Sequence, residues 1–269
     1  MEVVVWEYRG LKAYNAKVIE TPSTKEVWIY DEPVIYRTKR KEAEPDESKQ
    51  SGTSARKQAE SLRRKQKHYE QMRWVIARLI DCNFDDKTKF ITLTFKRNIT
   101  DIEQANTEFK NFVKRLNYHV YDQKKRTTKY IATWEKQKRG AIHYHVVFFG
   151  FPYVKKQELE RIWGHGFVSI NRIDVDSKEN RGRYLSKYFA KDLELKEHKK
   201  KAFFTSRNLK KPLVSRLVLD DEAIKAFTKE NILFSKEYQR KTYISEVMRR
   251  ANDDTIFHDT RVRYLKIRK

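Results

Sequence analysis

The order of strand-like and helix-like hydrophobic patterns between residues 89 and 193 constrains the fold more than any other feature of the sequence. Four β-branched and aromatic runs are typical of strands: Lys89–Phe95, Lys129–Trp134, Ile142–Phe149 and Gly166–Ile173. Apolar residues recur at helical spacing in three other segments: Asp101–Leu116, Val154–Trp163 and Glu179–Leu193. The resulting order β-α-β-β-α-β-α predicts an α+β fold, in which an antiparallel sheet carries helices packed on one face.

The two middle strands are separated by the short segment Lys136–Ala141, KQKRGA. Gly140 lies near its end and can adopt the positive φ that a tight hairpin turn requires. We therefore expect these strands to pair antiparallel, within a core of the ferredoxin-like kind.

The flanking segments have different compositions. Residues 1–36 contain alternating apolar runs and predict a β-rich unit, whereas the charged stretch from Arg37 to about Ser54 predicts a linker. Residues 55–81 predict a helix with a basic first half that includes Arg63, Arg64 and Lys65. Those cations either contact phosphates or form a solvated face.

Beyond Leu209 the pattern weakens, and we expect helices near Asp220–Thr228 and Lys236–Arg250 before a basic tail. The predicted organisation is thus a β-rich extension with a charged linker (1–54), a main domain with a leading basic helix (55–210) and a helical, basic C-terminal extension (211–269).

The charge balance indicates a polyanionic partner. The chain has 60 Lys and Arg against 37 Asp and Glu, a formal net charge of +23, which favours nucleic acid. No apolar stretch of spanning length and no signal-peptide pattern is present, so we expect a cytoplasmic protein without a membrane partner. Cys82 is the sole cysteine, so any metal must be held by His, Asp or Glu.

A pair of histidines is the first candidate for chemistry. His143 and His145 flank Tyr144 in a predicted strand, so both imidazoles should project from one face of the sheet. Glu135, across the hairpin, can reach the same side and complete a three-ligand site for a divalent metal, for which we expect Mg²⁺ or Mn²⁺. The alternative is that the two histidines only pack.

Two tyrosines are the second candidate. Tyr184 and Tyr188 are four residues apart on a predicted helix, and each is followed three residues later by a lysine, Lys187 and Lys191. A tyrosine hydroxyl can attack phosphorus, and nearby ammonium groups stabilise the negative charge that develops. Alternatively, the two rings are core contacts of an amphipathic helix.

These motifs together resemble the HUH endonuclease superfamily, and in particular its rolling-circle replication initiators of plasmids and small phages. The resemblance rests on FITLTF (Phe90–Phe95), on WEKQKRGAIHYHVVFFGF, on RGRYLSKYFAKD and on SRNLK (Ser206–Lys210), in that order. It covers roughly residues 88–210. The chain has no GxxxxGK[ST] phosphate loop, so we expect a host helicase to unwind the DNA.

The resemblance implies a metal-dependent nickase that cuts and rejoins single-stranded or hairpin origin DNA through a 5′-phosphotyrosine. Glu135, His143 and His145 would bind the metal, and Tyr188 or Tyr184 would be the nucleophile, with Tyr188 the expected one. We expect DNA contacts from basic residues in and beside the motifs: Arg63, Arg64, Lys65, Arg139, Arg183, Arg207 and Lys210. The alternatives are a single-strand transposase or mobilisation relaxase, and a non-enzymatic DNA- or RNA-binding regulator.

Overall fold

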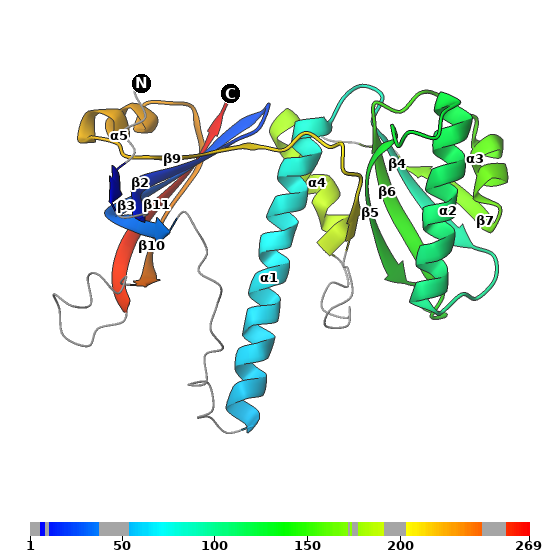
Figure 1. Cartoon of the computed structure of the whole chain (residues 1–269), viewed down its shortest axis with the longest axis horizontal. Coiled ribbons are helices and arrows are strands. Elements are labelled where there is room, and N and C mark those ends of the chain that lie inside the picture. Colours follow the sequence, from blue (N-terminus) through cyan, green and yellow to red (C-terminus); the bar gives the residue numbers. More distant parts are fainter. Residues whose placement is uncertain are drawn as a thin grey trace. The chain divides into compact units, whose positions relative to one another are not determined.

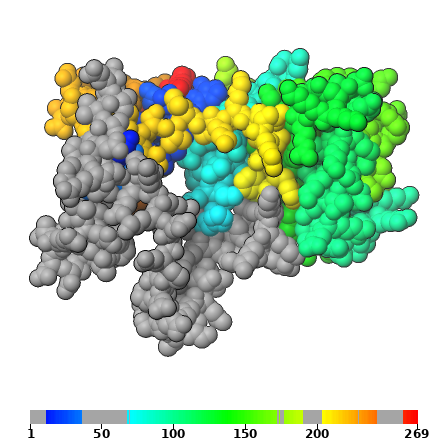
Figure 2. Space-filling view, in the orientation of Figure 1, coloured from blue at the N-terminus to red at the C-terminus, as the bar shows by residue number. Residues whose placement is uncertain are grey.

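The computed structural model of the chain describes residues 6–8, 11–37, 54–171, 173, 177–190, 203–243 and 257–269. Figure 2 shows in colour the residues whose side chains are described. The chain forms two compact units. We call residues 53–211 the central unit and residues 1–52 with 212–269 the terminal unit.

The central unit contains a five-stranded antiparallel sheet in the order β7-β4-β6-β5-β8. Its strands are β4 (Lys89–Phe95), β5 (Lys129–Lys136), β6 (Ile142–Phe149), β7 (Gly166–Asn171) and β8 (Phe203–Thr205). The first four have the strand order of a ferredoxin-like split β-α-β arrangement. The predicted strands are therefore confirmed, while β8 is an addition that the sequence analysis did not anticipate.

Helices cover both faces of this sheet (Figure 1). On one face, α2 (Ile102–Tyr121) and α3 (Lys156–Trp163) pack in the core, where Phe112 and Trp163 contribute fully buried side chains. On the other face, α1 (Ser54–Asn83) and α4 (Lys178–Ala190) bury their apolar residues against Phe90, Ile131 and Val147. The α+β class is confirmed, with helices on a second face as well as on the predicted one.

The same strands supply both cores because side chains alternate along a strand. In β6, Tyr144 and Val146 face α2 and α3, whereas Val147 faces α1 and α4. His143 and His145 share the parity of Val147, so the α4 side of the sheet receives both imidazoles. No described helix is long and apolar enough to span a membrane.

The terminal unit is a six-stranded antiparallel sheet made from both ends of the chain. Its strands are β1 (Trp6–Tyr8), β2 (Leu11–Glu20), β3 (Thr24–Arg37), β9 (Leu213–Leu217), β10 (Ile232–Tyr243) and β11 (Phe257–Arg268). The order is β1-β2-β3-β11-β10, and β9 pairs with the remaining part of β2 beside β1. Because β3 pairs directly with β11, the predicted N- and C-terminal extensions share one sheet.

Helix α5 (Asp221–Thr228) covers one face of the terminal sheet. Its Phe227 packs with Val18, Val27 and Leu265 from three strands, and Asp220 caps it by accepting a hydrogen bond from the Ala223 backbone N–H at 2.8 Å. The helix predicted near Asp220–Thr228 is therefore confirmed.

The helix predicted over Lys236–Arg250 is wrong for residues 236–243, which belong to β10. Polar and aromatic residues alternate there with the period of a strand, and β11 pairs with β10 along its length. Residues 244–250, like most of the predicted linker (38–53), lie outside the described part of the chain.

Candidate metal and tyrosine site

The β5–β6 hairpin places the predicted acid opposite the first histidine. Glu135 pairs directly with His143 in the antiparallel register. The turn closes with a hydrogen bond from the Gln137 N–H to the Ala141 carbonyl at 2.8 Å, and Gly140 has a φ of +84°, as predicted. Arg139 ties the turn to the neighbouring strand by donating from Nη2 to the Phe95 carbonyl at 2.7 Å.

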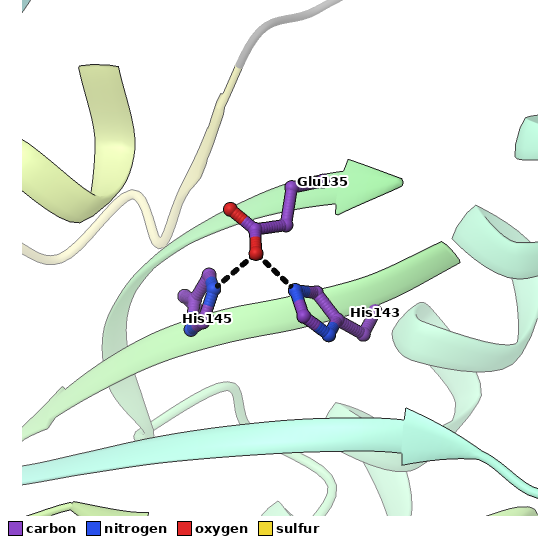
Figure 3. Close-up of side chains that lie close together, drawn as sticks. All are labelled: Glu135, His143 and His145. Carbon is purple, nitrogen blue, oxygen red and sulfur yellow. Dashed lines mark hydrogen bonds and ion pairs between the residues drawn. The ribbon is translucent and has the colours of Figure 1, made fainter. Parts of the chain in front are cut away.

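The three predicted ligands converge on one another (Figure 3). Glu135 Oε1 lies 2.6 Å from His143 Nε2 and 3.4 Å from His145 Nε2, and the potential ligand atoms all lie within 4.8 Å of one another. Each side chain is only 11–12% exposed. Hydrogen bonds from His143 and then His145 hold the pKa of the Glu135 carboxyl well below its ordinary value, so it is ionised at neutral pH.

This donor set fits a divalent cation. Two imidazole nitrogens and one carboxylate oxygen on the same side of a sheet give three protein ligands and leave further positions for water or phosphate oxygens. The anionic carboxylate already draws both Nε2 atoms towards one point, where a cation would replace the shared protons.

A second layer of hydrogen bonds orients one of the imidazoles. Thr92 Oγ1, on β4, lies 3.0 Å from His145 Nδ1 and accepts a hydrogen bond from Asn171 Nδ2 at 2.9 Å. When Nδ1 carries the proton, Nε2 is left as the ligand atom, which is how such partners select a tautomer. His143 Nδ1, in contrast, is buried without a hydrogen-bond partner in the described structure.

Neither Thr92 nor Asn171 was identified from the sequence. A signal for Thr92 was available, because it lies within FITLTF and the register of β4 against β6 makes it the direct neighbour of His145. Asn171 could not be found in this way, because its contact depends on β7 pairing at the opposite edge of β4.

Helix α4 brings the two tyrosines to the same face. The Tyr188 ring lies 4.9 Å from Phe90 and 6.0 Å from the His145 ring, centroid to centroid. Tyr184 and Tyr188 share a hydrogen bond between their hydroxyls at 3.2 Å. This bond, with burial as a lesser cause, raises the pKa of Tyr188, so the phenol is protonated at neutral pH.

The packing of α4 explains why the tyrosines lie there. Leu185 and Phe189 are fully buried in the core shared with α1, and each such side chain contributes about 1.5–3 kcal/mol. Gly182 allows the two helices to approach closely, since a Cβ at this position would lie 2.2 Å from the Ala77 carbonyl oxygen. The helix is therefore fixed by residues on either side of each tyrosine.

Tyr144, between the two histidines, belongs to the opposite core. It is fully buried, stacks on Phe109 with centroids 4.6 Å apart, and donates its hydroxyl to Asn106 Oδ1 at 2.7 Å. Burial raises its pKa. The polar hydroxyl is thus satisfied within the hydrophobic layer, and the phenol is turned away from the candidate metal ligands.

The predicted basic residues are distributed unevenly. Lys187 and Arg183 are exposed on α4, the helix that carries the tyrosines. Arg207 and Lys210 are also exposed, and the Lys210 backbone is held by Asn83 through bonds of 2.9 Å at both its N–H and its carbonyl.

Four other predicted residues cannot be placed. Lys191 lies outside the described residues, and of the helical residues Arg63, Arg64 and Lys65 only the backbone is described. Arg139 is largely engaged by the Phe95 carbonyl. The assignment of all these cations to DNA binding remains a prediction.

Comparisons with known proteins agree with the motifs. Residues 88–193 match a family of replication-associated proteins, of the ORF2 kind. The "Phasyl DNA replicon protein arp" of Escherichia coli is 28% identical over 146 residues, which corresponds to 45% of this chain and 49% of that protein. The chain therefore covers about half of the length of this relative. No solved structure is significantly similar to the chain. The predicted resemblance to rolling-circle replication initiators is thus confirmed for the segment that contains the histidine and tyrosine motifs.

Proposed function

We propose that the protein is a replication initiator that nicks and rejoins single-stranded origin DNA through a covalent 5′-phosphotyrosine. The observation that carries the proposal is the proximity of two chemically different groups. Three potential metal ligands cluster within 4.8 Å, and the ring of Tyr188 lies 6.0 Å from one of them, His145. The similarity of residues 88–193 to replication-associated proteins supports this function.

Glu135, His143 and His145 would hold a divalent cation, Mg²⁺ or Mn²⁺. When bound, such a cation supplies Lewis acidity that polarises the scissile phosphate. The site is nearly closed by protein, since these side chains are only 11–12% exposed, and a low local dielectric strengthens electrostatic interactions with a bound phosphate.

Tyr188 is the proposed nucleophile. Its Oη attacks the phosphorus atom, a Tyr–O–P bond forms at the 5′ side of the nick, and the bond from phosphorus to the 3′ oxygen breaks. The phenol loses its proton, and the departing 3′ oxygen takes one up to become a free 3′-OH. Rejoining reverses these steps, because the phosphotyrosine conserves the energy of the original bond.

Tyr184 and the α4 cations have supporting roles in this proposal. Tyr184 hydrogen-bonds the nucleophile at 3.2 Å and raises the pKa of Tyr188, so the phenol needs activation at the moment of attack. Lys187 is exposed on the same helix, and together with Lys191 it would stabilise the charge that develops on phosphate and phenolate. Tyr184 is also the candidate for a second strand transfer.

Cleavage of labelled single-stranded DNA from the vicinity of the gene tests the proposal. With Mn²⁺ we expect a nick that EDTA abolishes, and that His143→Ala removes without loss of DNA binding. His119→Ala is the matched control, because His119 lies on α2 and contacts Glu158 instead of the metal cluster. Cleavage that persists in EDTA, or in a Tyr184→Phe/Tyr188→Phe double variant, would refute the proposal and favour a non-enzymatic DNA-binding role.

A further inference from the structure

The terminal sheet carries an organised row of aromatic and basic side chains. Residues paired directly across neighbouring strands share a face of the sheet. The registers align five such residues on one face: Arg216, Lys17, Trp28, Tyr264 and Lys236. The Trp28 and Tyr264 rings lie 5.0 Å apart, and Lys17 Nζ is 5.5 Å from the centre of the Trp28 ring.

The edge strand β10 extends this row with an alternating pattern. On the same face it presents Phe234, Lys236, Tyr238 and Arg240, an aromatic and a cation in turn. Phe234 is 52% exposed and Tyr238 is 37% exposed, and the Phe234 ring lies 6.1 Å from Tyr264. We call the row and these β10 residues, with Lys266 beside Phe234, the aromatic–basic face.

Acidic side chains are segregated from this face. Glu237 projects from the opposite side of β10, where it pairs with Arg261 and with Arg263 at 2.9 Å. Glu26 lies on the aromatic–basic face but is only 5% exposed and accepts a hydrogen bond from the Tyr264 hydroxyl at 3.1 Å. The exposed ionic groups on β10 on this face, Lys236 and Arg240, are therefore positive.

The two faces of the sheet have different roles. The opposite face carries the hydrophobic residues, such as Val27 and Leu265, that α5 covers. An apolar core on one side accounts for the stability of the sheet, but it does not account for exposed rings on the other. Phe234 and Tyr238 lose favourable burial by lying at the surface, which is a common property of binding sites.

We propose that the aromatic–basic face binds single-stranded DNA, with unpaired bases stacked on Phe234 and Tyr238 and phosphates contacted by Lys236 and Arg240. Alternate residues of a strand are about 6.7 Å apart, so successive rings and cations can serve successive nucleotides of an extended strand. Single strands expose the flat surfaces of their bases, whereas a duplex buries them in its own stack. The choice of DNA over RNA rests on the proposed function.

Photo-crosslinking of the full-length protein tests this inference directly. The probe is oligodeoxythymidylate substituted with 5-iododeoxyuridine, which couples to stacked aromatic side chains, and excess EDTA prevents cleavage. We expect adducts on the peptide that contains Phe234 and Tyr238. Adducts confined to the central unit would overturn the proposal, as would preferential binding of duplex DNA or of oligouridylate at this peptide.

Affinity measurements with variants give an independent readout. Phe234→Ala/Tyr238→Ala should weaken oligodeoxythymidylate binding about 5- to 100-fold, the range expected for the loss of one or two stacked bases. Lys236→Ala/Arg240→Ala should reduce the slope of log K against log salt by about 0.7 for each phosphate that the variant no longer neutralises. Circular dichroism checks that each variant is folded.

Two matched controls distinguish this surface from general effects. Tyr153→Ala removes an aromatic ring that is 83% exposed in the central unit, and Lys124→Ala/Lys125→Ala removes two exposed cations there. Equal losses in these controls would overturn the proposal. Nicking with Mn²⁺ is scored separately: unchanged crosslinking without cleavage refutes the proposed enzymatic function, whereas cleavage without this crosslink refutes the present inference.

Discussion

Replacing Thr92 with valine removes the hydroxyl that orients His145 while keeping the shape of the side chain. Thr92 Oγ1 lies 3.0 Å from His145 Nδ1 and 2.9 Å from Asn171 Nδ2, so the substitution leaves two polar groups without this partner. Because His145 is largely buried, water replaces the lost bond poorly. The imidazole is then free to rotate or to adopt the other tautomer, and its Nε2 is no longer held ready for a cation.

The expected loss follows from these contacts. One net hydrogen bond to the ligand and partial desolvation of Nδ1 amount to about 1.5–2 kcal/mol, or roughly a 10- to 30-fold increase in the Kd for Mn²⁺. This agrees with the usual cost of removing a partner behind a metal ligand. Isothermal titration calorimetry of the apo protein with Mn²⁺ measures the change, and cleavage at saturating Mn²⁺ should recover most of the lost rate.

Thr94→Val is the matched control for this prediction. Thr94 lies two residues along β4 on the same face, opposite His143, and its hydroxyl bonds neither imidazole. It should therefore leave Mn²⁺ affinity nearly unchanged. Equal affinity in wild type and Thr92→Val, or equal losses in both threonine variants, would refute the positioning role of Thr92.

Three further predictions concern the helix and the groups around it. Gly182→Ala places a Cβ against the Ala77 carbonyl and should destabilise the protein by about 1–3 kcal/mol or more, measured by chemical denaturation; an unchanged midpoint would contradict the close α1–α4 packing. Burial raises the pKa of Cys82 to about 11, so iodoacetamide should label the folded protein slowly at pH 8, and stability should fall as pH rises above about 8.5, the usual thiol pKa; rapid labelling of the folded protein would contradict this. Tyr184→Phe should lower the pKa of Tyr188 and move the alkaline rise of the cleavage rate to lower pH, and an unshifted pH–rate profile would show that their hydrogen bond does not restrain the nucleophile.

The central unit could be predicted from the sequence because its information is local. Strands β4 and β6 are continuous β-branched and aromatic runs, and their bounds agree with the predicted ones. The parity of His143 and His145 is sufficient to place both imidazoles on one face, and the short turn at Gly140 brings Glu135 opposite. Most of the candidate site therefore follows from the period of a strand and one hairpin.

The terminal sheet could not be predicted in this way because its pairing is not local. β3 pairs with β11, more than 200 residues later in the chain, and no turn connects them. β10 carries few apolar residues, and the alternation of Phe234, Lys236 and Tyr238 was mistaken for part of a helix that continued beyond residue 243. The contact of Asn171 with Thr92 is hidden from the sequence for the same reason.

Identification of the amino acid that carries DNA after cleavage tests the central claim most directly. The protein is incubated with Mn²⁺ and a labelled single strand that contains the nick site, digested with protease and nuclease, and sequenced by tandem mass spectrometry. We predict a nucleotide phosphate on Tyr188, absent when His143 is replaced by alanine. A nucleotide attached elsewhere than α4, or an adduct that forms equally well without the three metal ligands, would contradict the account.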